Sequence, residues 1–201
     1  MKSRPMTSIR RFKSGPFSIL ALMISGLIIS GLMISTAPAH ADMPVTYRDD
    51  GRSLFSVSAP DFWTVRAGGA RELAASGDAA QGVARVIGMH PVSEPRVWVG
   101  FVSPQGVRSF DQAAQYLRDI GPFLVKSPQV DSRKSLKVGG LAAKSIAGHG
   151  RRKGKAVNFT ALMIALPNGR MAISVTVIEA GADPAITTDV NAIYNSFRAI
   201  R

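Results

Sequence analysis

The alternation of apolar and polar residues along the chain predicts several β-strands. It covers residues 54–59, where Pro60 ends the pattern, and it predicts two further strands at 83–89 and 96–103. The six residues between the last two strands include two prolines and indicate a hairpin connection. Residues 66–82 are rich in Ala and Gly and follow no clear period, so we expect a loop there.

A longer hairpin is predicted near the C-terminus. The nearly continuous apolar run 156–166 is typical of a central strand, Pro167-Asn168-Gly169 supplies turn residues, and the alternation resumes over 171–177. Upstream, residues 134–147 are expected to form a strand that a Gly-Gly pair interrupts, followed by a polar, basic turn at 149–155.

Two amphipathic helices are predicted. Ser109 stands three residues before Gln112, which is a capping-box arrangement, and apolar residues then recur at helical spacing until Gly121-Pro122 ends the pattern. The second helix is expected to begin at Asp183-Pro184, an N-cap followed by proline at the first helical position. Its apolar stripe should dock on the sheet and comprises Ile186, Val190, Ile193, Tyr194, Phe197 and Ile200.

These elements follow the order strands, helix, strands, helix, with short connections. Short connections favour antiparallel pairing, so we expect an α+β fold in which helices flank an antiparallel β-sheet. Residues 42–201 would form a single domain, because about 160 residues suffice for one core that buries roughly 70% of the surface of the unfolded chain.

Residues 1–41 have the three parts of a secretory signal peptide. Five basic residues and no acid lie between Met1 and Lys13, the run 17–35 is uncharged, and Ala39 and Ala41 form a small-x-small cleavage site. We therefore expect cleavage after Ala41 and a periplasmic or secreted protein without a transmembrane span. The alternative is an uncleaved N-terminal membrane anchor, because the uncharged run approaches the roughly 20 residues that span a bilayer.

Charge is concentrated in one region of the chain. The full chain carries 25 Lys and Arg against 13 Asp and Glu, and the expected mature part keeps 20 against 13, a net charge of +7. Nine basic residues and one acid lie between Lys126 and Lys155. The chain has no cysteine, which excludes disulfides, thiolate nucleophiles and Cys-ligated zinc or iron–sulfur sites.

Motifs for catalysis or metal binding are absent from the expected mature chain. Its two histidines, His90 and His149, have no partner at metal-ligand spacing, and no G-x-S-x-G, S-x-x-K or phosphate-loop motif occurs. Asp49-Asp50 is typical of a turn, and Asp111 and Asp119 lie on a predicted helix. We therefore assign no catalytic residue, metal or cofactor, although a triad can also be assembled in space from distant residues.

The most unusual segment is the basic hairpin tip, which we define as Arg151, Arg152, Lys153 and Lys155. Four positive charges in five residues would attract an anionic lipid, an acidic polymer or an envelope protein. Nucleic acid is not expected, because nucleic-acid modules usually add stacking aromatic residues and Phe159 is the only one nearby. The competing interpretation is a solvated tip whose charges block edge pairing and aid solubility.

Three segments resemble motifs of the PsbP-like superfamily, which includes photosystem II PsbP, periplasmic DcrB-like proteins and a Ran-binding nuclear factor. The superfamily has an opening strand that ends in Pro before Trp, which FSVSAPDFW resembles. A later strand of the superfamily has the pattern Val-x-Gly-x-x-Ala, which LKVGGLAAKSIAG resembles. The closing helix of the superfamily resembles AIYNSFRAI. The resemblance covers most of 54–200. It implies an antiparallel sheet flanked by helices, and an accessory or binding protein more readily than an enzyme.

Two classes of function follow from these observations. The first is an exported, non-enzymatic accessory or binding protein, in a narrower form one that binds anionic lipid or polymer through the basic hairpin tip. The second is a small cofactor-free envelope hydrolase. A cleft that gathers His, Ser and acidic side chains would favour the enzyme, whereas an exposed apolar or basic patch would favour binding.

Overall fold

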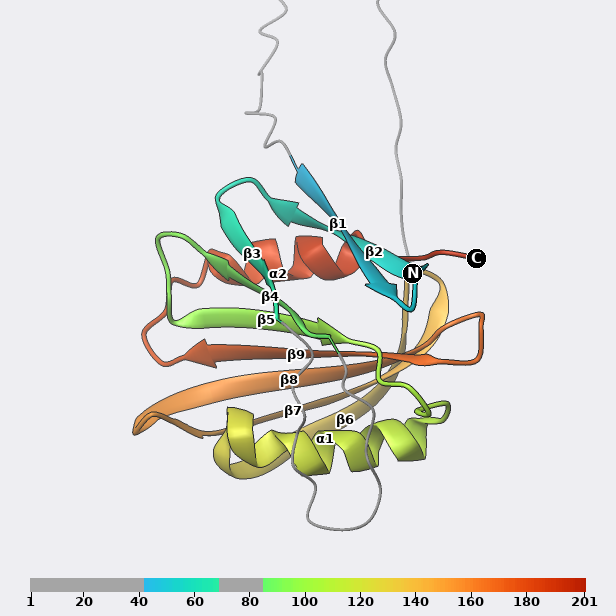
Figure 1. Ribbon diagram of the computed structural model, residues 1–201. Coiled ribbons are helices and arrows are strands. Elements are labelled where there is room, and N and C mark those ends of the chain that lie inside the picture. The colour runs from blue at the N-terminus through green and yellow to red at the C-terminus, as the bar shows by residue number, and fades with distance from the viewer. Residues whose placement is uncertain (1–41, 69–84) are drawn as a thin grey trace, which may run out of the picture. The chain divides into compact units, whose positions relative to one another are not determined.

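The structure is a computed structural model that describes residues 42–68 and 85–201 (Figure 1). The expected signal peptide, most of the expected loop at 66–82 and the start of the strand expected at 83–89 lie outside these residues. The elements in chain order are β1 (Asp42–Asp49), β2 (Arg52–Pro60), β3 (Trp63–Ala67), β4 (Ile87–Pro91), β5 (Val97–Val102), α1 (Phe110–Leu124), β6 (Lys126–Val138), β7 (Leu141–Arg152), β8 (Lys155–Ala165), β9 (Met171–Glu179), α2 (Ile186–Asn195) and β10 (Arg198–Ala199).

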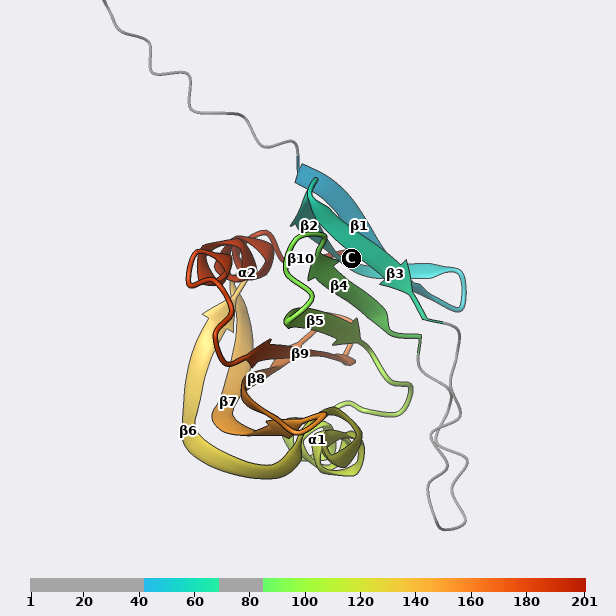
Figure 2. The ribbon, with the colours of Figure 1, turned by 90° about the vertical axis from the view of Figure 1, so that its left-hand side faces the viewer.

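The strands form two antiparallel sheets. A small sheet has the order β1-β2-β10, and a seven-stranded sheet has the order β3-β4-β5-β9-β8-β7-β6. Figures 1 and 2 show α1 and α2 on different sides of the middle strands of the large sheet, with β1 and β2 on the side of α2. The expected α+β fold with helices flanking an antiparallel sheet is therefore confirmed.

Strand β9 lies at the centre of the large sheet and is buried on both faces. Met171 and Ile173 pack with residues of α1, whereas Ala172 belongs to the core that α2 covers. Two polar side chains on the α2 face of the strand are hydrogen-bonded to Tyr194 of α2. The Tyr194 hydroxyl lies 3.0 Å from Oγ of Ser174 and 2.6 Å from Oγ1 of Thr176. The expected alternation over 171–177 is confirmed, and both sets of alternating positions face a core.

Aromatic rings fill the core between the small sheet, α2 and the large sheet. Phe55 of β2 stacks on Tyr47 of β1 with ring centroids 4.9 Å apart, and on Phe197 at 5.1 Å. Phe101 of β5 closes this cluster at 6.0 Å from Phe55. The cluster joins the two sheets, and all four rings are almost inaccessible to solvent.

Helix α1 begins as expected and ends later than expected. Ser109 and Gln112 form the capping box, with Oγ of Ser109 accepting from the Gln112 amide at 3.2 Å. The helix then continues through Pro122, so the expected end at Gly121-Pro122 is wrong. Proline removes a single hydrogen bond here. The Gly121 carbonyl still accepts from the amide of Val125 at 2.9 Å, which closes one more turn.

The polar turn expected at 149–155 is shorter in the structure. Strand β7 runs to Arg152 and β8 starts at Lys155, so the turn consists of Lys153 and Gly154. Both adopt the left-handed conformation, with φ of 49° and 81°, as a two-residue hairpin turn requires. The interruption expected at the Gly-Gly pair is confirmed as the β6–β7 turn, although β6 begins at Lys126, eight residues earlier than expected.

The closing helix is also shorter than its apolar stripe indicated. The expected start at Asp183-Pro184 is wrong, because Ala185 is the N-cap of α2 and the helix begins at Ile186. In the preceding turn the Asp183 carboxylate accepts from the backbone amide of Ala185 at 2.9 Å. It ends at Asn195, so Phe197 and Ile200 lie beyond it. They are nevertheless held by the small sheet, because the Ile200 amide donates to the carbonyl of Leu54 at 2.9 Å. Within the described ranges, no helix is long and apolar enough to cross a membrane.

Candidate functional site

A groove lies between α1 and the large sheet, and the strand register builds its floor. The pairings of β6, β7, β8 and β9 place Arg133, Ile146, Ala161 and Val175 in one row across the sheet. The next row on the same face contains Phe159 of β8 opposite Gly148 of β7. Side chains on one face of a sheet are neighbours along such rows, so these residues form a continuous surface beneath the helix.

Small side chains keep the space between this floor and α1 open. Ala161 stands in the sheet, and α1 contributes Ala114 and Gly121. Gly148 acts within the sheet and not as part of the groove lining. A Cβ atom on Gly148 would lie 2.0 Å from the Gln129 carbonyl oxygen and 2.8 Å from Cζ of Phe159. The glycine therefore lets the Phe159 ring lie across β7 and lets β6 approach it closely.

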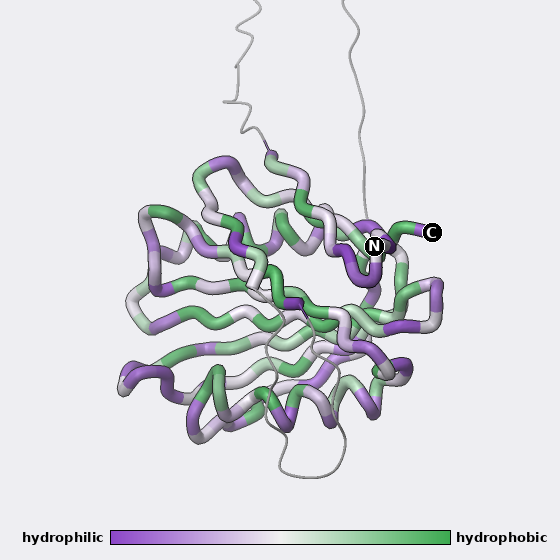
Figure 3. Tube along the Cα trace, viewed as in Figure 1, coloured by the Kyte–Doolittle hydropathy of each residue, from purple (hydrophilic) through white to green (hydrophobic). Residues whose placement is uncertain are grey.

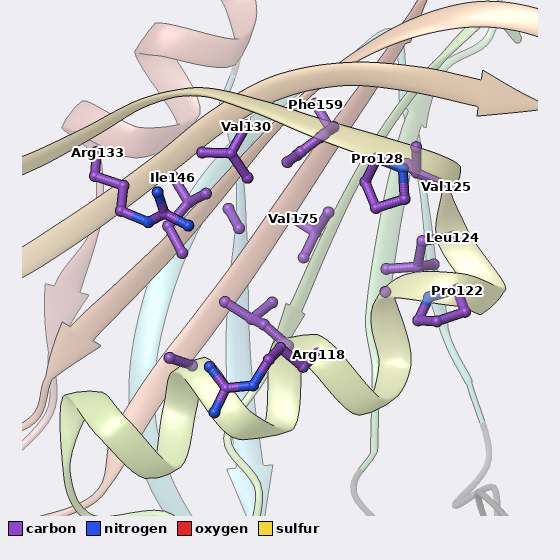
Figure 4. A pocket seen from close by; sticks show the side chains of 14 residues that line it. Arg118, Pro122, Leu124, Val125, Pro128, Val130, Arg133, Ile146, Phe159 and Val175 are labelled. Carbon is purple, nitrogen blue, oxygen red and sulfur yellow. The ribbon is translucent and has the colours of Figure 1, made fainter.

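The resulting α1 groove has a volume of about 340 Å³. Figure 4 shows Val130, Ile146, Phe159 and Val175 reaching from the strands toward α1. Arg118 and Arg133 lie on the side away from the end of the helix. The lining is otherwise mainly apolar and consists of Ala114, Leu117, Arg118, Gly121, Pro122, Leu124, Val125, Pro128, Val130, Arg133, Ile146, Phe159, Ala161 and Val175.

A second, polar space of about 310 Å³ adjoins the α1 groove near the start of the helix, and we call it the basic compartment. The two spaces share Ala114, Arg133 and Ile146. Nζ of Lys144 lies 4.8 Å from the ring centroid of Phe110. The compartment is lined by Phe110, Asp111, Ala114, Arg133, Lys134, Ser135, Lys144, Ser145, Ile146 and Met163.

The basic hairpin tip lies at the β7–β8 turn, and Figure 3 shows the strongly hydrophilic end of that hairpin. Two of its four cations have partners that are distant in sequence. Nζ of Lys155 pairs with Oε2 of Glu179 at 3.0 Å, and the Arg152 guanidinium lies 5.8 Å from the ring centroid of Trp98. Arg151 and Lys153 are exposed, and Arg151 donates to the carbonyl of Gly154 at 3.1 Å.

The two histidines of the expected mature chain lie apart from the groove. Nδ1 of His149 is 3.0 Å from Oδ2 of Asp131 in an exposed pair, and Nδ1 of His90 is 3.2 Å from the carbonyl oxygen of Pro91. Neither ring is hydrogen-bonded to a serine or threonine among the described residues. Across the same part of the chain, no group of three or more His, Asp or Glu side chains is arranged to hold a metal ion.

The carboxylates considered from the sequence have separate roles. Asp50 and Gly51 form the turn between β1 and β2, while Asp49 makes an ion pair with Arg170. Asp111 lies in the first turn of α1 and lines the basic compartment. Oδ1 of Asp119 accepts from Nε2 of the Gln115 side chain at 2.8 Å on the exposed side of α1.

Buried titratable groups stabilise the fold. Burial raises the pKa of Tyr116 to about 12 and also raises the pKa of Tyr194, so both phenols stay protonated. Hydrogen bonds from Arg96 lower the pKa of the Glu94 carboxyl. The same guanidinium donates to the carbonyl of Gly181, which fixes the segment before α2.

The α1 groove was not among the sites expected from the sequence. Its residues come from α1, β6, β7, β8 and β9, and only the pairing register brings them together. One local signal was available, because Ala161 interrupts a run of larger residues over 157–164. Small residues inside strands often mark a close approach of another group.

Comparisons with known proteins place the fold near several solved structures. No protein-family model matches the chain, and neither does any curated protein. The solution structure of cyanobacterial PsbP from Synechocystis sp. PCC 6803 is similar at 10% identity and a TM-score of 0.48, over 85% of this chain and 100% of that one. The sequence motifs resemble those of the PsbP-like superfamily, and the solution structure of one PsbP protein is among the similar structures.

Two further structures show a similar course of the backbone. One is LpqN, described as involved in cell envelope biogenesis of Mycobacterium tuberculosis, at 18% identity and a TM-score of 0.45, over 80% of this chain and 91% of that one. The other comes from Bacteroides thetaiotaomicron, at 11% identity and a TM-score of 0.46, over 73% of this chain. The present chain spans 45% of that protein's length. These similarities concern the fold alone.

Proposed function

We propose that the chain is an exported, non-enzymatic binding protein and that the α1 groove holds its ligand. The observation that carries this proposal is the mainly apolar cavity of about 340 Å³ between α1 and the sheet. The groove is open to solvent along one side, and exposed residues such as Arg118 and Arg133 belong to its lining. Ligand pockets commonly have volumes of about 300–1,000 Å³ and mainly apolar walls with a few polar groups.

A groove-filling substitution tests this proposal. Ala114→Leu adds apolar volume on the groove side of α1, and leucine is a good helix former, so the helix should persist. We expect purified wild-type protein to bind one equivalent of the neutral probe N-phenyl-1-naphthylamine with increased fluorescence. The variant should bind it at least about tenfold more weakly, since it loses contacts across the cavity.

Ala192→Leu is the matched control, because Ala192 is an exposed alanine on the other helix. It should bind the probe like the wild type. Absence of probe binding in the wild type, or equal binding by all three proteins, would mean that the α1 groove is not a ligand site.

Export is the second part of the proposal. It is supported by the basic start, the uncharged run and the Ala39-x-Ala41 site of the leader. N-terminal sequencing of protein recovered from the periplasm or medium should therefore begin at Asp42. Recovery of the full-length chain in the membrane fraction would instead support the N-terminal anchor.

We propose the basic hairpin tip as a second site, one that contacts an anionic lipid surface. The exposed side chains of Arg151 and Lys153 favour it, and Lys126 stands opposite Arg151 in the β6–β7 pairing. Three neighbouring cations at one end of a sheet give a local positive field whose reach falls with salt.

Replacing Arg151 and Lys153 with serine should weaken binding to anionic vesicles, while the free energy of unfolding changes by less than about 0.5 kcal/mol. Co-sedimentation with vesicles at low and high salt measures the binding, which should fade at high salt for the wild type. Replacing the exposed Arg66 and Lys137 with serine changes the net charge equally and should weaken binding less. If the two double variants sediment alike, the tip is only a solvated turn.

A further inference from the structure

The α1 groove and the basic compartment together form one elongated site that is apolar at one end and cationic at the other. Groove residues occur along α1 from Ala114 to Leu124, and compartment residues begin at Phe110. At 1.5 Å per residue, the combined site follows the helix for roughly 20 Å. Its walls are mainly apolar near Leu124 and carry cationic side chains near Phe110, so the two ends suit different parts of one ligand.

Two cations stand on the sheet where the apolar part meets the polar part. Arg133 belongs to the lining of both spaces. Lys144 is its diagonal neighbour, because Arg133 pairs with Ile146 and Lys144 pairs with Ser135 across β6 and β7. Diagonal neighbours in an antiparallel pair have Cα atoms roughly 7–8 Å apart, so one anionic group between them can contact both side chains.

These two charges have no carboxylate partner in the structure. None of the ion pairs among the described residues involves Arg133 or Lys144, although Asp111 also lines the compartment. By contrast, Arg118 donates to Oε1 of Gln115 at 2.5 and 3.1 Å and is held by its own helix. Lys144 contacts the Phe110 ring, but neither cation has a carboxylate partner among the described residues, so the pair favours an anion at this position.

From this geometry we propose that the ligand is a fatty acid, held in one orientation. This inference rests on the proposed function of the α1 groove. The carboxylate would lie between Arg133 and Lys144, and the alkyl chain would run beneath α1 toward Leu124, past Phe159 and Val175. One apolar groove of about 340 Å³ beside one cationic pair fits one chain with one anionic head, whereas a diacyl lipid needs room for two chains.

Displacement of the neutral probe N-phenyl-1-naphthylamine from the purified protein distinguishes the contributions of chain and head. Dodecanoate and dodecanol have the same alkyl length, and dodecyltrimethylammonium reverses the charge. We expect dodecanoate to displace the probe at least about tenfold more effectively than either, as charge-assisted hydrogen bonds add to the shared apolar contacts. High salt should narrow this difference, because Arg133 and Lys144 are exposed and an ion pair with them is screened.

Arg133→Gln should weaken dodecanoate about tenfold and leave dodecanol unchanged, whereas Arg66→Gln, at an exposed position on β3, should change neither. Equal displacement by dodecanoate and dodecanol, or stronger displacement by the cation, would overturn the fatty-acid assignment and leave the groove as a site for neutral apolar ligands. The fatty-acid assignment would also be overturned if the probe binds and no amphiphile displaces it. Failure of the probe itself to bind would overturn the proposed function instead.

Discussion

Replacing Phe197 with alanine is expected to lower the free energy of unfolding by about 3–5 kcal/mol. The Phe197 ring is fully buried and stacks on Phe55, with ring centroids 5.1 Å apart and planes inclined by 25°. It also lies 6.5 Å from the ring of Phe101. Alanine would lose these contacts and leave a cavity where the small sheet, the large sheet and α2 meet.

Urea unfolding followed by circular dichroism measures this loss. Asn191→Ala, at an exposed position of α2, is the control and should change the free energy of unfolding by less than about 0.5 kcal/mol. Similar losses for the two variants would show that the residues after α2 are not packed between the sheets.

The parts of the fold that the sequence predicted are those determined by neighbours along the chain. The alternation at 171–177, the Pro167-Asn168-Gly169 turn and the capping box at Ser109 each depend on residues within a few positions. All three occur in the structure. The last turn of α1 was missed because Pro122 removes one hydrogen bond only, and the packing of α1 against the sheet compensates for that loss.

Other features depend on partners that are distant in sequence, so local patterns do not reveal them. The mixed sequence of β1 has no clear period, and the strand forms because β2 supplies its hydrogen bonds. At the basic hairpin tip, the partners Trp98 and Glu179 lie on β5 and β9. The four cations are equivalent in the sequence, whereas the structure gives Arg152 and Lys155 side-chain partners and leaves Arg151 and Lys153 without one among the described residues.

The α1 groove depends on the registers of several strand pairings at once. Arg133 and Val175 stand in the same row only because three successive strand pairings have the register observed. A shift of one residue in any of them would turn a side chain to the opposite face of the sheet. The composition of the groove was thus visible in the sequence as scattered small and apolar residues, but its location was not.

Replacing Arg170 with methionine is expected to cost about 3–5 kcal/mol of stability, because it leaves the Asp49 carboxylate without its partner in a mostly buried position. Nη1 of Arg170 lies 2.7 Å from Oδ2 of Asp49, and Nη2 donates to the carbonyl of Ser103. The two side chains are only 18% and 15% exposed. The guanidinium therefore links the end of β1 to the segment after β5 and to the β8–β9 turn.

A double variant separates the contribution of the ion pair to the free energy of unfolding from the contribution of lost packing. Arg170→Met combined with Asp49→Asn removes both charges, so the free energy of unfolding should recover part of the loss seen with Arg170→Met alone. Arg66→Met, at an exposed position of β3, should change stability by less than about 0.5 kcal/mol. If the double variant is as unstable as the sum of its single variants, Asp49 and Arg170 act independently. In that case β1 is held by its pairing with β2 and not by this contact between the two sheets.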